Sequence, residues 1–270
     1  MKPVRLLRTI ALGGVCALGL LPVRAATTPY VEDFESYPPG DTAVTNFGEV
    51  ATADWIVAAP SFSGKGYENA ISVSVAGIGF AAGKASSAAI ELTDLAGSAF
   101  SISTLFRIDS LVATSVDPSG TAFVGLAARA SDGSYAASGA DRYELAYYLD
   151  GTTGRPTGKL YLTEKNTFFG DGLGGALSAG TLVAVPGNVY WLNLSGTPVG
   201  AALAVTATLV DISGGGSITV SATDSANVLS GTFFGYSNFV RVQDGGATAI
   251  NVDFDTFSTL PDELFSDGFE

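Results

Sequence analysis

The stretch Phe100-Ser101-Ile102-Ser103-Thr104-Leu105-Phe106-Arg107-Ile108 decides the fold class. Its even positions are aromatic or β-branched throughout, whereas its odd positions include serine and arginine. An alternation of period two places one face of a β-strand on a core and leaves the other face partly in water. The stretch therefore predicts a long strand in an antiparallel sheet.

The same alternation recurs after residue 26, where no helical period persists for three turns. It predicts about a dozen strands, at residues 30–35, 54–58, 71–75, 88–92, 100–108, 121–130, 142–149, 158–165, 189–195, 202–211, 231–242 and 249–260. Asp132-Gly133, Asp150-Gly151 and Asp244-Gly245-Gly246 are predicted as tight turns between strands. The glycine-rich residues 170–180 are predicted to form a mobile surface loop.

The two ends of the chain differ from its middle. Three basic residues, an apolar stretch at 9–21 and the small residues of Val23-Arg24-Ala25 predict a signal peptide over residues 1–25. One β-sandwich domain is expected at 26–260, followed by an acidic tail at 261–270 that is either disordered or a sorting segment. The predicted location is therefore secreted, periplasmic or on the surface of a bacterial cell.

Charge and residue types restrict the function. The chain has 13 basic and 26 acidic residues; without its leader it would keep 13 − 4 = 9 basic residues and a net charge of 9 − 26 = −17. That field disfavours nucleic acid and anionic membranes. There is no histidine, and the single cysteine, Cys16, lies in the leader. Catalytic triads, Cys–His pairs and ordinary zinc sites therefore lack essential members, so the sequence predicts a protein that is not an enzyme.

The order of segments resembles the concanavalin A-like, laminin-G-like sandwiches. The resemblance spans about residues 30–260 and rests on residues 31–35, the strand of Trp55, and residues 101–107, 124–129, 189–194 and 252–257. It implies two antiparallel sheets in a jelly roll, with the first and last strands side by side. It also implies that the more curved sheet is a sugar-binding face. Function nevertheless depends on the site and not on the fold.

Carboxylate catalysis is the enzymatic alternative, as a glycoside hydrolase or a polysaccharide lyase. Sandwich glucanases of this superfamily carry Glu-x-Asp-x-x-Glu on one strand, and this chain has no such segment. A lyase with a tyrosine base needs a basic partner, but Arg142 and Tyr143 are adjacent and would lie on opposite faces of a regular strand.

The acidic residues in the first and last predicted strands have two possible interpretations. If the first and last strands pair as the resemblance implies, four carboxylates could come close together. Their mutual repulsion would then require either wide separation or a cation such as calcium, which prefers oxygen ligands. The predicted ligands are Asp33, Glu35, Asp253 and Asp255. The alternative is that these are solvated acids of edge strands that discourage aggregation.

A sugar-binding face would use aromatic rings with a few polar groups. The candidate ligand-binding residues are Tyr143, Tyr147, Tyr161, Tyr236, Asn238 and Arg241. Trp191 is a further candidate for the sugar-binding face, but it lies in an apolar run and is expected in the core. The predicted function is a carbohydrate-binding or surface-adhesive module that binds a polysaccharide or cell-surface glycan. The alternative is a structural protein of the cell envelope or matrix without a small ligand.

Overall fold

The computed structural model of the chain describes residues 26–42, 44, 47, 54–59, 61–62, 64–114, 121–151, 154–165 and 171–260. The predicted signal peptide and the acidic tail lie outside these residues. Within them, no helix has the length and apolar character needed to cross a membrane.

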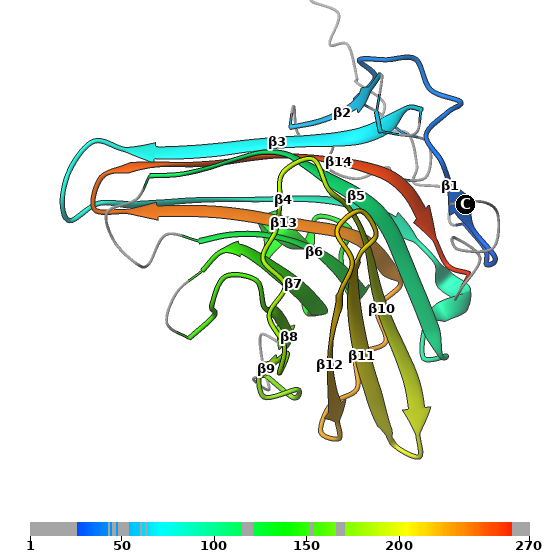
Figure 1. Ribbon diagram of the computed structural model, residues 1–270. Helices are drawn as coiled ribbons and strands as arrows, with labels where there is room; N and C mark the ends of the chain where they lie inside the picture. The colour runs from blue at the N-terminus through cyan, green and yellow to red at the C-terminus, as the bar shows by residue number, and fades with distance from the viewer. Residues whose placement is uncertain are drawn as a thin grey trace, which may run out of the picture.

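Two antiparallel sheets form a sandwich, which confirms the predicted fold class (Figure 1). The eight-stranded sheet contains β1 (Val31–Glu32), β2 (Trp55–Ala58), β3 (Gly66–Val75), β5 (Phe100–Ala113), β10 (Val189–Val199), β11 (Ala202–Asp211), β12 (Ser217–Asp224) and β14 (Gly246–Ser258). The six-stranded sheet contains β4 (Ala81–Glu91), β6 (Thr121–Ala130), β7 (Arg142–Asp150), β8 (Leu160–Lys165), β9 (Ala176–Leu177) and β13 (Phe233–Gln243).

The strand order agrees with the jelly roll that the resemblance implies. The larger sheet runs β12-β11-β10-β5-β14-β3-β2, and the smaller runs β4-β13-β6-β7-β8-β9. The first strand pairs with the last, Val31 opposite Ser258. In Figure 1, β3 and β14 run across the molecule while β10, β11 and β12 turn steeply away from them, so the larger sheet is strongly twisted.

Three local predictions need correction. A short helix, α1 (Tyr135–Ser138), follows Asp132-Gly133, so β6 and β7 are not joined by a two-residue turn. Residues 171–180 are not a free loop, because they contain β9, which pairs with β8, and they bury Leu173. The sequence does not predict the strand β12, because its alternating residues are mostly serine and threonine, which are also typical of a polar loop.

The core lies between the sheets and is rich in aromatic rings. The even positions of the opening stretch are all buried, as predicted. The ring of Tyr236 on β13 lies 4.3 Å from that of Phe254 on β14 and 5.5 Å from that of Trp55 on β2. Rings from both sheets thus interlock, and each buried ring of this size contributes about 2–3 kcal/mol through burial.

A buried polar bridge also joins the sheets. The amide nitrogen of Asn238 on β13 donates to Oδ1 of Asn69 on β3 at 2.9 Å. Asn69 in turn donates to Ser86 Oγ at 3.1 Å, which also accepts the indole N–H of Trp55 at 2.7 Å. Because these groups lie within the core, each depends on its partner to offset the cost of leaving water.

We expect Asn238→Ala to destabilise the protein by about 2 kcal/mol, because it leaves the buried Asn69 oxygen without its donor. Urea unfolding of the wild type, the two single alanine variants at Asn69 and Asn238, and the double variant measures the coupling. The double variant should lose less stability than the sum of the single variants. Additive losses would show that the bridge does not join the sheets energetically.

Candidate functional site

Trp191 lies on the outer face of the eight-stranded sheet. The inward side chains of β10 are Tyr190, Leu192 and Leu194, all fully buried, whereas Trp191 on the opposite face is partly exposed. This corrects the expectation that Trp191 belongs to the core. In the sequence, Trp191, Asn193 and Ser195 alternate with apolar residues, which indicates that these three share an outward face. The large apolar ring of Trp191 favours the core and so hides this pattern.

Hydroxyl groups continue the outer face across the next two strands. In register, Asn193 lies opposite Thr208 and Thr208 opposite Thr219; Ser195 lies opposite Thr206 and Thr206 opposite Ser221. We call these six residues the hydroxyl grid. Within it the side-chain oxygens of Thr206 and Ser221 are 2.9 Å apart, and those of Thr208 and Thr219 are 3.2 Å apart. These contacts orient four of the six side chains toward one another.

A hollow of about 470 Å³ adjoins the grid. It is lined by Thr28, Leu95, Ala99, Phe100, Ser101, Trp191, Asn193, Ser195, Gly196, Thr197 and Thr259. None of these lining residues is charged. Ring, amide and hydroxyl groups in an uncharged hollow suit a ligand that is itself neutral and rich in hydroxyls.

Asn193 is oriented by its neighbours on β5. Its amide nitrogen donates to Ser101 Oγ at 2.9 Å and to the carbonyl of Ile102 at 3.1 Å. Both amide protons of Asn193 are therefore directed toward β5. One wall of the hollow is also fixed, because the N–H of Thr28 donates to Asp94 at 2.7 Å.

Four of the six predicted ligand-binding residues lie in the core. Tyr143, Tyr147 and Tyr236 are fully buried and Asn238 is 1% exposed, so none offers an open surface to a sugar. All four point from β7 or β13 toward the eight-stranded sheet, and their polar atoms form hydrogen bonds within the protein. For example, the hydroxyl of Tyr143 donates to Asp224 at 2.6 Å. Burial raises the pKa of Tyr143, which is the opposite of what a tyrosine base requires.

Tyr161 and Arg241 lie instead on the outer face of the six-stranded sheet. Tyr161 pairs with Ala146 rather than with Tyr147, a difference of one residue that reverses its face. Tyr161 lies at one end of a row of aromatic rings that come one from each of four adjacent strands. The row consists of Phe239, Phe123, Tyr148 and Tyr161, and the centroids of neighbouring rings are 5.6 to 6.3 Å apart. The two central rings are at most 6% exposed, so only the ends of the row reach the surface.

The four predicted calcium ligands do not form one group. Asp33 and Glu35 are exposed; Asp33 accepts the N–H of Glu35 at 3.1 Å, and Glu35 accepts that of Lys65 at 2.6 Å. Asp253 is buried 3.7 Å from Arg107, and burial raises its pKa to about 6. No cluster of three or more acidic, histidine or cysteine side chains suited to a metal occurs in the described ranges. Calcium binding stays a prediction.

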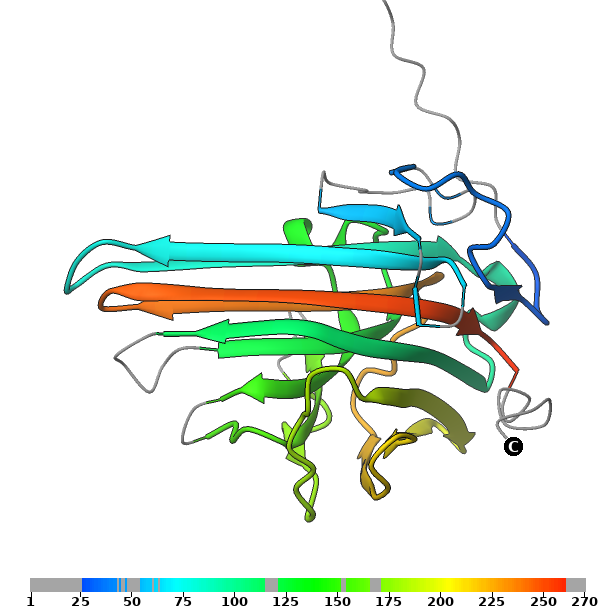
Figure 2. The ribbon, with the colours of Figure 1, turned by 45° about the horizontal axis from the view of Figure 1, so that its top comes forward.

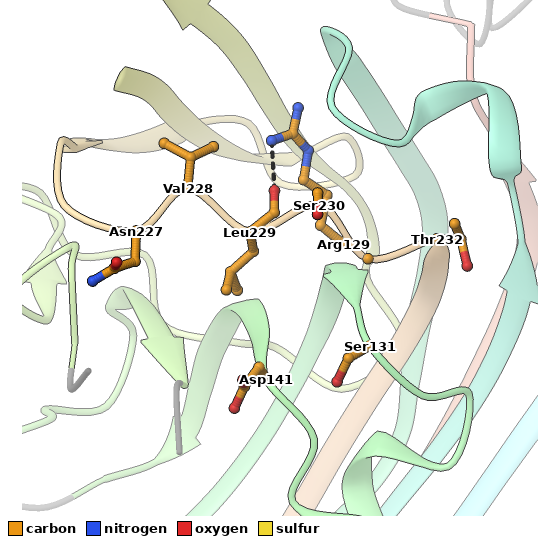
Figure 3. A pocket seen from close by; sticks show the side chains of 9 residues that line it. Arg129, Ser131, Asp141, Asn227, Val228, Leu229, Ser230 and Thr232 are labelled. Atoms are coloured by element: carbon orange, nitrogen blue, oxygen red, sulfur yellow. Dashed lines mark hydrogen bonds between the residues drawn. The ribbon is translucent and has the colours of Figure 1, made fainter. Parts of the chain in front are cut away.

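A second pocket, of about 540 Å³, lies beside Arg129 at the end of β6 (Figure 3). Arg129 is 1% exposed and has a φ of 51°, and its guanidinium donates to the carbonyls of Leu229 and Ser98. Figure 3 shows the bond to Leu229 as a dashed line. Gly231 approaches the carbonyl of Ala130 so closely that a Cβ there would collide with it. Arg129 thus ties the 227–232 segment to β6.

Buried acids are held by specific partners. Glu144 on β7 accepts from Arg142 at 2.8 Å, from Ser237 at 2.9 Å and from Lys165. Burial alone would raise the pKa of Glu144, but the charges of Arg142 and Lys165 lower it to about 2. Glu164 and Asp224 flank Gly172, where a Cβ would collide with both carboxylates, and they are 2% and 0% exposed.

Comparisons with known proteins give structural likeness without sequence kinship. No family model and no curated protein matches the chain. Among solved structures it is similar to the CBM2 module of the Lactobacillus casei BL23 phage J-1 evolved Dit, at 12% identity over 86% of this chain and 96% of that one, with a TM-score of 0.40. It is similar to lectin II from Ulex europaeus, at 15% identity over 76% and 89%, with a TM-score of 0.37.

A third similar structure is Scytalido-glutamic peptidase bound to a peptide-based transition-state analogue. The identity is 16%, the match covers 60% of this chain and 66% of the peptidase, and the TM-score is 0.32. The match thus spans less than two thirds of the peptidase.

The Glu144 cluster predicts acid sensitivity. Because the folded-state pKa of Glu144 lies below its ordinary value of 4.5, its carboxylate stabilises the fold above that value, and this stability is lost as pH falls toward 2. We expect Glu144→Gln to lower the free energy of unfolding by about 3 kcal/mol at pH 7 and to flatten its decline between pH 5 and pH 2. Urea titrations across that pH range measure both effects.

Asp109→Asn is the matched control, since Asp109 forms an ion pair with the partly exposed Arg107 at 2.5 Å. Exposed pairs contribute about 1 kcal/mol or less, so this variant should change little. An unaltered pH profile in Glu144→Gln would contradict the account.

Proposed function

We propose that the protein is a carbohydrate-binding module and that a neutral polysaccharide binds on the outer face of β10, β11 and β12. The single observation that carries this proposal is the partly exposed Trp191 ring beside an uncharged hollow and two rows of hydroxyls. An aromatic ring provides apolar contact area for the face of a sugar, and hydroxyl and amide groups fix its orientation.

The spacing of the grid favours a chain-like ligand over a single sugar. Neighbouring strands lie about 4.8 Å apart, so two rows across three strands repeat the same polar groups at near-constant intervals. A polysaccharide repeats its own hydroxyls in the same way. Because many weak contacts add up along such a chain, an extended ligand would bind more tightly than its monosaccharide unit.

The absence of charged side chains among the residues that line the hollow favours neutral over acidic glycans. The protein carries a formal net charge of −13, and the lining of the hollow contains no basic residue to offset that field. A polyuronate or sulfated chain would be repelled. A neutral polysaccharide pays no such electrostatic cost.

The proposal includes a non-catalytic role and export by the predicted leader. In support, the sequence has no histidine. Glu144 forms ion pairs with Arg142 and Lys165, and the side chains of Glu164 and Asp224 are buried. Hydrolysis of a glycosidic bond needs two carboxyl groups that reach the substrate from opposite sides. None of the described residues that line the hollow beside Trp191 carries a carboxylate.

A polysaccharide panel with neutral and acidic members tests the proposal. We expect retention on at least one neutral polysaccharide, with Trp191→Ala weakening binding about tenfold or more, as truncation of an aromatic anchor does. Thr208→Val, which keeps the β-branched shape and removes only the hydroxyl, should weaken it less. Affinity electrophoresis or isothermal titration measures each variant.

Tyr161→Ala is the control, because Tyr161 is a partly exposed aromatic residue on the outer face of the opposite sheet. It should bind as the wild type does. Loss of binding in Tyr161→Ala with full binding in Trp191→Ala would move the site to the other sheet and refute this proposal. No binding to any polysaccharide would favour the structural alternative.

A further inference from the structure

Among the described residues, no strand pairs with the outer edge of β3 over residues 71–75. On that side β2 pairs only with Gly66 to Asn69, and the N–H of Ala70 donates to the carbonyl of Asp54. Beyond this point no described strand continues the sheet. Figures 1 and 2 show β3 extending well past the end of β2. An unprotected edge of this kind can pair with another strand.

The edge leads into an exposed apolar tip. Ile78 and Phe80, in the turn between β3 and β4, are 87% and 66% exposed. A hollow of about 360 Å³ beside them is lined by Val75, Ala76, Gly77, Phe80 and Ala81. Two large, exposed apolar side chains beside a hollow and a strand edge form a candidate contact surface.

The tip is held rigid by its neighbour. The N–H of Gly79 donates to Oδ1 of Asp244 at 2.6 Å, and the N–H of Asp244 donates to the carbonyl of Phe80 at 2.9 Å. Asp244 and Gly245 have φ values of 57° and 89°, which the tight turn between β13 and β14 requires. Figure 2 shows the two hairpins projecting side by side beyond the rest of the sandwich. Such a fixed surface loses little entropy on binding.

The charge distribution near the β3 edge favours a second copy of the chain as the partner. Residues 69–83 form a stretch of fifteen without a charged side chain, between Glu68 and Lys84. A chain with a net charge of −13 repels its own copies over most of its surface. The strand edge itself carries no charge, and the acid at the tip, Asp244, accepts the N–H of Gly79. The sequence of the edge is also self-complementary. In an antiparallel pair centred on Val73, Ile71 meets Val75 of the other copy and Ser72 meets Ser74, so apolar faces apolar and serine faces serine.

We propose that two copies of the chain form a dimer with two-fold symmetry by pairing the β3 edges at residues 71–75. The pairing joins the two eight-stranded sheets into one continuous sheet. In this register, Ala76 of each copy lies opposite Ala70 of the other. The turn that carries Ile78 and Phe80 therefore reaches the N-terminal end of β2 in the other copy. The dimer therefore satisfies the free backbone groups of both edges and covers both tips.

Sedimentation equilibrium of the full chain tests the dimer. The wild type should dimerise at micromolar concentration. Ser72→Lys combined with Ser74→Lys should weaken the dimer about tenfold or more, because it places like charges across both serine pairs. Ser72→Lys combined with Ser74→Glu should restore it, because it places opposite charges across the same pairs. Both residues are exposed, so circular dichroism should stay unchanged.

The matched control adds two lysines to the other open edge strand of the same sheet. Ser217→Lys combined with Thr223→Lys on β12 should leave the dimer intact, and both positions are exposed. A wild type that stays monomeric at high concentration would overturn the proposal, as would equal dissociation by the β12 variant. A monomer that instead binds vesicles of zwitterionic lipid through Ile78 and Phe80 would also overturn it.

A cross-link tests the register in a Cys16→Ser background, which removes the only native cysteine. Val73→Cys should form an intermolecular disulfide on mild oxidation, because a residue on the two-fold axis lies about 4.5–5.5 Å from its copy. Val75→Cys should not, since it is offset from its own copy by four residues, or about 13 Å. Cross-linking at Val75 but not at Val73 would contradict the proposed pairing.

Discussion

The packing of aromatic rings between the two sheets is the constraint on which the rest of the structure depends. Tyr236 stands at its centre, with the ring of Phe254 4.3 Å away across the sandwich. Rings of this size hold stacked sheets about 10 Å apart, and they require each strand to turn one defined face inward. Once that face is fixed, every alternate residue must face outward. The outward position of Trp191 therefore follows directly from the burial of its neighbours Tyr190 and Leu192.

The two outer faces then differ in chemistry. On the six-stranded sheet, the buried Glu144 is neutralised by Arg142 and Lys165, and a row of aromatic rings packs beside it. Such a network is costly to open, because any group separated from it would be left charged and poorly solvated. On the eight-stranded sheet, serine and threonine hydroxyls lie open beside Trp191. Hydroxyls exchange water for a ligand at little cost, which suits this face for reversible binding to a neutral partner.

Much of the fold could be predicted from the sequence, because it rests on alternation that single strands record. The strands over residues 121–130 and 202–211 match the structure residue for residue. The site could not be predicted in the same way. Alternation says which residues of one strand share a face but not which face is inward, and a shift of one residue moved Tyr161 to the side opposite Tyr147. The strand β12 was missed because its hydroxyl-rich residues resemble a loop, although they complete the grid.

Trp191 is the residue proposed to contact the ligand, and it can be probed directly because the chain has only two tryptophans. Trp55 is fully buried in the core, whereas Trp191 is partly exposed. Labelling with 5-fluorotryptophan gives two ¹⁹F resonances, which a Trp191→Phe variant assigns. Titration with a neutral polysaccharide that the protein retains should shift the Trp191 resonance and leave that of Trp55 in place. Saturating binding that moves neither resonance would contradict the account.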